Sequence, residues 1–264
     1  MGERPIGVFD SGIGGLTVLK ELLDHLPAES FIYFGDTARV PYGTKSGDTV
    51  RRFSRENVQF LLERGVKSIV VACNTASAEA LQMLKREFSV PIVGVIEPGV
   101  HAAVEASENG RIGVIGTAAT VRSGAYQAGI ALLRGEADVT AAPCPLFVPL
   151  AEEGWVDHPV TEMVAREYLE EFRSRDIDTL VLGCTHYPLL KPVIGRVMGP
   201  SVGLVDSAVE TAHEMKRVIH SEEIVGGNGN GHFAVVLSDT SPTFEDIARR
   251  FLGRDIPEIE LVGS

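Results

Sequence analysis

Two short segments of the chain are alike, and each places a cysteine after an apolar run. Residues 68–75 read SIVVACNT, and residues 179–186 read TLVLGCTH. Short apolar runs of this kind are typical of buried parallel strands. Ligands of open α/β sheets bind beyond the carboxyl ends of the strands, so Cys73 and Cys184 occupy positions where such folds carry out chemistry. Two equivalent thiols predict a pair of groups that act on one substrate.

The similarity between the two halves of the chain extends beyond the cysteines. Apolar segments at 6–10 and 112–116 precede the cysteines at similar distances, and segments at 91–97 and 201–206 follow them. This order and spacing predict two similar α/β halves that arose by duplication. The alternative is that the strands of any α/β chain recur at such intervals by chance.

Strand-like segments alternate with helical patterns along the whole chain. Strands are expected at 5–9, 31–35, 67–72, 91–96, 111–116, 137–142, 178–183, 202–206, 233–238 and 256–262. Helices are expected around leucines 16–26 and at 47–64, 75–88, 98–107, 123–133, 159–174, 189–198, 208–219 and 242–252, with a loop between 142 and 159. This alternation predicts an α/β fold with mainly parallel sheets flanked by helices on both faces.

The expected domain organisation follows from the sizes of the two halves. If they are equal, the C-terminal strands must return to pack on the first half. We therefore expect a discontinuous first α/β domain, 1–97 plus 208–264, and a second α/β domain, 98–207. The glycine-rich stretch 226–231 is expected to be a flexible turn.

Composition and charge limit the class of protein and its partners. With 264 residues and 44% hydrophobic residues, the chain resembles ordinary globular proteins, and it has no apolar stretch near the ~20 residues that span a membrane. The N-terminal residues lead directly into an expected core strand, so we expect no signal peptide and a cytoplasmic location. The net charge of −12 argues against a nucleic-acid partner. A small anionic substrate is compatible with this net charge, since backbone N–H groups in a pocket can hold an anion.

The cysteines predict neither a disulfide framework nor a zinc site. There are 3 of them, and none belongs to a CxxC motif. Cys73, Cys144 and Cys184 lack close-spaced Cys or His partners, and His186 lies too near Cys184 for both to bind one metal readily. Cys144, among prolines and apolar residues, is interpreted as a packed small hydrophobe. No metal site is expected.

Polar loops follow several of the expected strands. The turn at 10–15, DSGIGG, joins a strand to a helix, so its backbone N–H groups could hold a carboxylate or a phosphate. It lacks the Lys-Ser/Thr ending of a P-loop and the GxGxxG spacing, which argues against a nucleotide site. Hydroxyl, amide and imidazole groups follow other strands, at Thr37, Asn74, Thr75, Thr117, Thr120, Thr185 and His186. Each could serve only as a helix N-cap, but their joint placement in both halves favours a binding site.

Five segments carry a specific resemblance to a known family. They are DSGIGG at 10–15, PYG at 41–43, ACNTAS at 72–77, GCTHYP at 183–188 and VDS at 205–207. In order, and over nearly the whole chain, they resemble the signature segments of the glutamate racemases. The resemblance implies two pseudo-symmetric domains with the active site in the cleft between them, often in a homodimer. It implies a cofactor-independent enzyme that interconverts L- and D-glutamate, the latter serving peptidoglycan synthesis.

The resemblance also implies roles for single residues. Cys73 and Cys184 would be the acid/base pair. Asp10 would assist proton movement near Cys73, and His186 would do so near Cys184. Asp36 and Glu152 match further acidic residues of the family's site. The groups that hold the substrate would be Asp10, Ser11, Tyr42, Gly43, Asn74, Thr75, Thr117, Thr120, Thr185 and His186. Purely structural roles stay open for His186, Asp36 and Glu152.

Two thiols suit the inversion of an α-carbon. A proton must leave one face of the carbon and another must reach the opposite face, whereas a single base tends to return the proton to the face it came from. A thiol with an unperturbed pKa of about 8.5 is mostly protonated at neutral pH, so neighbouring groups must help it act as a base.

Other functions remain as alternatives. Aspartate racemases share the fold and the cysteine pair, although the segment THYP at 185–188 favours glutamate. Related decarboxylases keep only one thiol. A non-catalytic amino-acid-binding protein would use the same carboxylate-holding loops but would not need a thiol on each side.

Overall fold

The computed structural model describes residues 4–221, 229 and 231–263. The strands are β1 (Ile6–Asp10), β2 (Phe31–Gly35), β3 (Ser68–Val71), β4 (Ile92–Gly94), β5 (Arg111–Gly116), β6 (Asp138–Pro143), β7 (Thr179–Gly183), β8 (Gly203–Val205), β9 (Phe233–Leu237) and β10 (Ile259–Leu261). The α-helices are α1 (Leu16–His25), α2 (Gly47–Glu63), α3 (Asn74–Glu87), α4 (Ile96–Ala106), α5 (Ala118–Ser123), α6 (Ala125–Leu133), α7 (Phe147–Glu152), α8 (Pro159–Ser174), α9 (Lys191–Met198), α10 (Ser207–Ser221) and α11 (Phe244–Leu252). Most of the expected turn at 226–231 lies outside the described residues.

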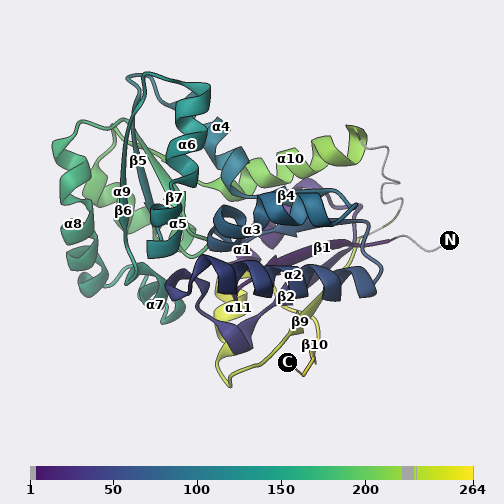
Figure 1. The fold of residues 1–264 in the computed structure, drawn as a ribbon. Coiled ribbons are helices and arrows are strands. Elements are labelled where there is room, and N and C mark those ends of the chain that lie inside the picture. Colours follow the sequence, from purple (N-terminus) through teal and green to yellow (C-terminus); the bar gives the residue numbers. More distant parts are fainter. Residues whose placement is uncertain (1–3, 222–228, 230, 264) are drawn as a thin grey trace.

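The strands form two sheets that repeat one topology. The first sheet has the order β10-β9-β2-β1-β3-β4, and the second has the order β6-β5-β7-β8. Every strand pair in the described part of the chain is parallel. The order β2-β1-β3-β4 matches β6-β5-β7-β8, so β3 and β7, the strands before the two cysteines, are equivalent. In Figure 1, the first sheet lies around β1 and β2, and the second lies around β5, β6 and β7. The predicted α/β fold class of two similar halves is confirmed.

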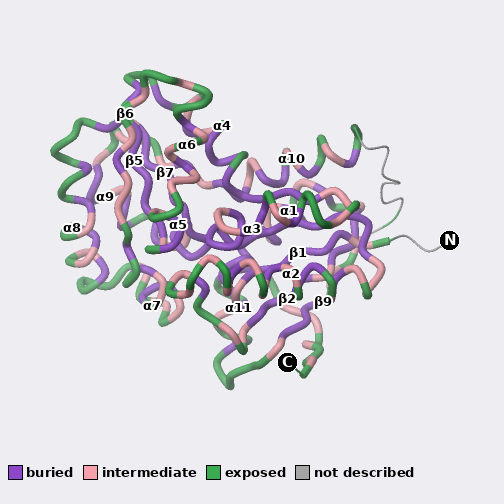
Figure 2. Tube along the Cα trace, in the orientation of Figure 1, coloured by how far each residue is buried: buried purple, intermediate pink, exposed green. Residues whose placement is uncertain are grey.

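Helices cover both faces of each sheet, which explains why the central strands are apolar throughout. All residues of β1, β3 and β7 are buried (Figure 2). In β1, Val8 packs in a cluster with residues of α1, α10 and α11, whereas its neighbour Phe9 packs with residues of α2 and α3. Successive side chains therefore enter different cores. The cluster around Val8 also contains Leu182 of β7, so one apolar core spans parts of both halves.

The C-terminal strands return to the first sheet, as expected. β9 pairs with β2 in the register Phe31↔Phe233, and β10 pairs with β9. Helix α10 contacts α1 and α4. The domain boundaries at 97/98 and 207/208 stay a prediction. Among the described residues, no helix is both long and apolar enough to cross a membrane.

Local structure departs from the expectations in the second half. The helix expected at 123–133 begins earlier and is split into α5 and α6, because Gly124 adopts a left-handed conformation with φ of 68°. The segment expected to be a loop contains α7, a helix of 6 residues without a side-chain cap and with Pro149 inside it. A helix this short carries too little periodicity to be recognised.

Loops that follow strands of the two sheets pack closely against each other. A Cβ atom on Gly14 would lie 2.2 Å from Thr185 Oγ1 and 2.5 Å from His186 Nδ1. A Cβ atom on Gly43 would lie 2.8 Å from Thr117 Cβ. Only glycine allows these approaches, so the halves meet through backbone that has no room for a side chain.

We expect Gly14→Ala to lower the free energy of unfolding by about 1–3 kcal/mol, because the added methyl group overpacks the contact with Thr185 and His186. Urea denaturation measures the change. Gly195→Ala in α9 is the control, since its Cβ atom would meet nothing closer than 3.7 Å. Equal effects of the two substitutions would contradict the tight contact at Gly14.

Candidate active site

A cavity of about 190 Å³ lies beyond the carboxyl ends of three strands from each sheet. Residues that follow β1, β2 and β3 line one part of it, and residues that follow β5, β6 and β7 line the other. The lining residues are Ser11, Val40–Thr44, Cys73–Thr75, Thr117, Ala118, Pro145, Val148, Pro149, Glu152 and Cys184–His186. The structure thus brings Cys73 and Cys184 to one cavity, one from each half.

Cys73 lies at the start of α3 and is 6% exposed. Its Sγ accepts a hydrogen bond from the backbone N–H of Ala76 at 3.5 Å and lies 3.7 Å from Ser11 Oγ. Burial, together with the nearby charge of Asp10, raises the pKa of Cys73 to about 12, although Ala76 and Ser11 act in the opposite direction. At neutral pH this residue is therefore a protonated thiol.

Asp10 does not line the cavity but lies beside Cys73. A Cβ atom on Gly15 would lie 2.6 Å from Asp10 Cβ and 3.0 Å from the Cβ of Ala72, the residue before Cys73. Asp10 Oδ2 accepts a hydrogen bond from Gly12 N at 2.9 Å, whereas the buried Oδ1 has no partner within the described part of the chain. Burial raises the pKa of Asp10, opposed by the charge of His186 and by backbone N–H groups. A carboxyl group of this kind can exchange a proton with its surroundings.

Cys184 has an imidazole as its neighbour. Its Sγ lies 3.8 Å from His186 Nδ1, and His186 Nε2 lies 2.9 Å from Glu152 Oε1. Burial alone would lower the pKa of His186, but the hydrogen bonds and charges of Cys184 and Glu152 raise it to about 10. The imidazole is therefore protonated at neutral pH, with one N–H donated to Glu152 and the other facing the sulfur. This cation stabilises negative charge on the sulfur.

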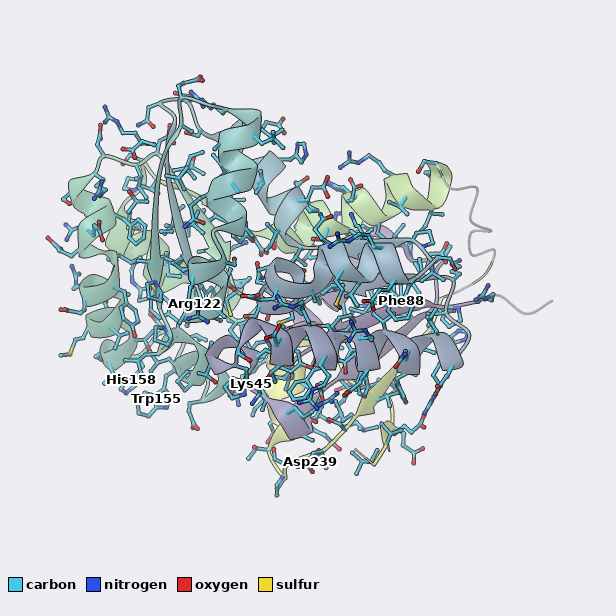
Figure 3. The ribbon with its side chains drawn as sticks, viewed as in Figure 1. Lys45, Phe88, Arg122, Trp155, His158 and Asp239 are labelled. Atoms are coloured by element: carbon cyan, nitrogen blue, oxygen red, sulfur yellow. The ribbon has the colours of Figure 1, made fainter. Side chains whose placement is uncertain are left out.

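Contacts from both halves hold Glu152 and His186 in place. The ring of Phe251 in α11 contacts His186 edge to face, with ring centroids 5.2 Å apart. Arg250 donates to the Glu152 carbonyl at 3.1 Å. In the segment after α7, the rings of Trp155 and His158 stack with centroids 4.4 Å apart at the edge of the second half (Figure 3). The carboxylate of Glu152 thus has a defined place relative to His186.

Three threonines form a cluster of hydroxyl groups across the two halves. Thr75 Oγ1 lies 2.9 Å from Thr117 Oγ1 and 3.3 Å from Thr120 Oγ1, and Thr117 lies 3.0 Å from Thr120. Thr75 belongs to α3, whereas Thr117 caps α5. Thr75 and Thr117 line the cavity, and Thr120 supports them from behind.

Asn74 and Thr185 also line the cavity, and each is held by a hydrogen bond. Asn74 Oδ1 accepts from the Tyr126 hydroxyl at 2.7 Å. The carbonyl of Thr185 accepts from the Thr17 hydroxyl at 3.0 Å. Ser11 and Gly43 complete the polar wall.

The structure does not bring Asp36 to the thiols. Its buried carboxylate accepts hydrogen bonds from Arg39 Nε at 2.8 Å, from Ser238 Oγ at 3.2 Å and from the Tyr42 hydroxyl. Tyr42 lines the cavity, but its hydroxyl faces Asp36 and also accepts from Asn57 at 3.1 Å. Asp36 therefore supports the loop that carries Tyr42.

Sequence reasoning missed the apolar part of the cavity wall. Val40, Pro145, Val148 and Pro149 line it, the last three in the segment expected to be a loop. Pro145, Val148 and Pro149 follow β6, the strand equivalent to β2, and the loop after β2 carries the predicted site residue Tyr42. This equivalence was the signal that could have assigned them to the cavity. Cys144 is fully buried in the apolar core, as expected, and no cluster of His, Cys, Asp or Glu suited to a metal occurs among the residues the structure describes.

Comparison with known proteins identifies the family. The family model for aspartate, glutamate and hydantoin racemases matches residues 6–215. This chain belongs to that family, and it is an amino-acid racemase. A glutamate racemase from Geobacter metallireducens is 52% identical to it, covering 97% of this chain and 95% of the relative.

Solved structures of family members agree with this assignment. A glutamate racemase isoform from Bacillus anthracis is 39% identical, with a TM-score of 0.94 and coverage of 98% of this chain and 97% of the other. A glutamate racemase from Francisella tularensis, solved in complex with D-glutamate, is 38% identical, with a TM-score of 0.93 and coverage of 99% and 98%. The racemase fold therefore extends over nearly the whole chain.

We expect Glu152→Gln to lower the pKa of His186 from about 10, because the substitution removes the negative charge at Nε2. Titration of the imidazole signals by NMR measures the shift. The substitution Glu153→Gln, at an exposed neighbour, is the control. An unchanged pKa in Glu152→Gln would contradict the assigned pairing.

The same pairing predicts how stability depends on pH. Because the pKa of His186 is raised above its ordinary value of 6.5, its contribution is fully present below pH 6.5 and is lost as the pH rises through about 10. Urea unfolding across this window should show a smaller loss of stability in Glu152→Gln than in the wild type. Identical pH profiles would contradict the expectation.

Proposed function

We propose that this chain is a cofactor-independent glutamate racemase that uses Cys73 and Cys184 as two bases on opposite faces of the α-carbon. The observation that carries the proposal is the placement of two thiols, one from each half, on one cavity. The relatives named as glutamate racemases, including the one bound to D-glutamate, support the choice of substrate.

The proposed reaction moves one proton at each face of the α-carbon. The thiolate of one cysteine removes the α-proton, and the electron pair of the broken C–H bond passes to the α-carbon and its carboxylate. The thiol of the other cysteine then donates its proton to the opposite face. The resemblance to the family assigns Cys73 to the proton of D-glutamate, and hence Cys184 to that of L-glutamate.

The surroundings of each thiol support its role. In the direction from L- to D-glutamate, Cys73 donates, and its raised pKa maintains the protonated state that this step requires at neutral pH. In the reverse direction Cys73 must first lose its proton, and Asp10, with one unpartnered oxygen nearby, is placed to receive it. On the other side, the protonated His186 stabilises the thiolate of Cys184.

Neutral donors and one imidazolium would hold the substrate. Among the described residues that line the cavity, none is Lys or Arg. The carboxylates would therefore be bound by side chains of Ser11, Asn74, Thr75, Thr117 and Thr185 and by the backbone N–H groups at the start of α3, where the helix dipole also favours an anion. Because these donors occupy fixed positions, they favour a substrate whose two carboxylates are separated by a matching distance.

The proposed function also implies an oligomeric state, a location and a metabolic role for the enzyme. We infer a homodimer in the cytoplasm that supplies D-glutamate for peptidoglycan synthesis and has neither nucleic acid nor membrane as a partner. We also propose the division into a discontinuous domain, 1–97 plus 208–264, and a domain of 98–207, with the cavity in the cleft between them.

We expect the purified protein to racemise L-glutamate without any added cofactor. The circular dichroism of L-glutamate should decay to zero, and dialysis against a chelator should leave the rate unchanged. L-Aspartate should react at least about tenfold more slowly, since it is one methylene shorter and its distal carboxylate cannot reach the same donors. Comparable rates on both amino acids would favour an aspartate racemase, and an unchanged signal would favour a binding protein.

We expect Cys73→Ser and Cys184→Ser each to abolish racemisation, because a hydroxyl group is too weak an acid to replace a thiol. Elimination of HX from a β-substituted glutamate needs only one base, so each variant should still act on the enantiomer that faces its remaining thiol. The two variants should therefore prefer opposite enantiomers.

Cys144→Ala is the matched control for both variants, because Cys144 lies in the apolar core and not on the cavity. It should retain nearly full racemase activity. The two-base assignment would be wrong if both serine variants preferred the same enantiomer, or if either kept full activity.

A further inference from the structure

The side chain of Asn74 is held by a residue from the other half of the molecule. Tyr126 lies on α6, is 1% exposed, and donates its hydroxyl hydrogen to Asn74 Oδ1 at 2.7 Å. Its ring is confined, since a Cβ atom on Gly99 would lie 3.3 Å from it and a Cβ atom on Gly183 would lie 3.1 Å from it. The hydroxyl therefore has little freedom to move away from Asn74.

The direction of this hydrogen bond follows from the two atoms that it joins. Asn74 Oδ1 is an amide oxygen and carries no hydrogen, so the Tyr126 hydroxyl is the donor. Burial raises the pKa of Tyr126 well above its ordinary value, although Ser207 opposes this, so the phenol keeps its hydrogen at neutral pH. The phenol hydrogen is therefore available to Asn74 Oδ1, which lies 2.7 Å from the Tyr126 oxygen.

This arrangement decides which way the Asn74 amide points. A side-chain amide has two orientations, which differ in whether the oxygen or the NH₂ group faces a given neighbour. Because Tyr126 is a donor, Asn74 must present its oxygen to Tyr126. The NH₂ group of Asn74 is then free to face the cavity, which Asn74 lines.

We propose that Tyr126 is a positioning residue for substrate binding: its hydroxyl orients the Asn74 amide so that the NH₂ group donates to a carboxylate of the substrate. The inference rests on the proposed function, in which the cavity binds glutamate. Since no Lys or Arg is among the described lining residues, each fixed neutral donor has a large share in holding the carboxylates.

The test is Tyr126→Phe, which removes one oxygen atom and keeps the ring in its packed place. Without the hydroxyl, the amide of Asn74 can turn its oxygen toward the carboxylate. We expect the KM for both enantiomers of glutamate and the Kd from calorimetry to rise about three- to tenfold. The kcat should change by less than about twofold, because the thiols and their partners are untouched.

Tyr168→Phe is the matched control. The Tyr168 hydroxyl contacts Leu146 N at 3.3 Å, outside the cavity, so this substitution should leave KM unchanged. Urea unfolding of both variants measures any general loss of stability. A similar rise of KM in both variants would overturn the inference.

A double-mutant cycle with Asn74→Ala shows whether Tyr126 acts through Asn74. Asn74→Ala should raise KM, and adding Tyr126→Phe should then have no further effect. If Asn74→Ala raises KM and Tyr126→Phe does not, or if the two effects add, the inference is wrong while the proposed function stands. A wild-type protein that neither binds nor racemises glutamate would overturn both.

Discussion

The carboxyl ends of two parallel sheets open onto the same cavity, and the rest of the site depends on this arrangement. Because the sheets repeat one strand order, the residues after β3 and β7 are equivalent, and these are Cys73 and Cys184. The loops can approach closely because Gly14 and Gly43 leave no side chain between the halves. The repeated backbone thus places one thiol from each half on the cavity, which is the arrangement that the proposed two-base inversion requires.

The backbone is repeated, but the groups around the two thiols are not. Asp10 lies near Cys73, and a protonated imidazole lies near Cys184. In the proposed reaction one cysteine must be a thiol while the other is a thiolate, and their roles exchange with the direction. Burial, which raises the pKa of Cys73, makes it a weak acid but a strong base once Asp10 has taken its proton.

The sequence predicted those features that depend on local pattern. Buried strands show as apolar runs, so both sheets and the two cysteines after them could be placed. Features that depend on tertiary contacts could not be predicted from the sequence. Asp36 resembles a site residue in sequence, yet its carboxylate is paired with Arg39 and with Ser238, which lies far along the chain. Tyr126 carries no local signal, because its contact with Asn74 exists only when the halves meet.

The central claim, that two different groups serve the two faces of the α-carbon, is tested most directly by racemising unlabelled L-glutamate in D₂O and analysing both enantiomers at low conversion. The account predicts that the D-glutamate formed carries deuterium at the α-carbon, because its new proton comes from a thiol in exchange with solvent. The remaining L-glutamate should carry none. D-Glutamate that retains the substrate's own hydrogen, or deuterium in the unreacted L-glutamate beyond that expected from the reverse reaction, would indicate a single base and contradict the account.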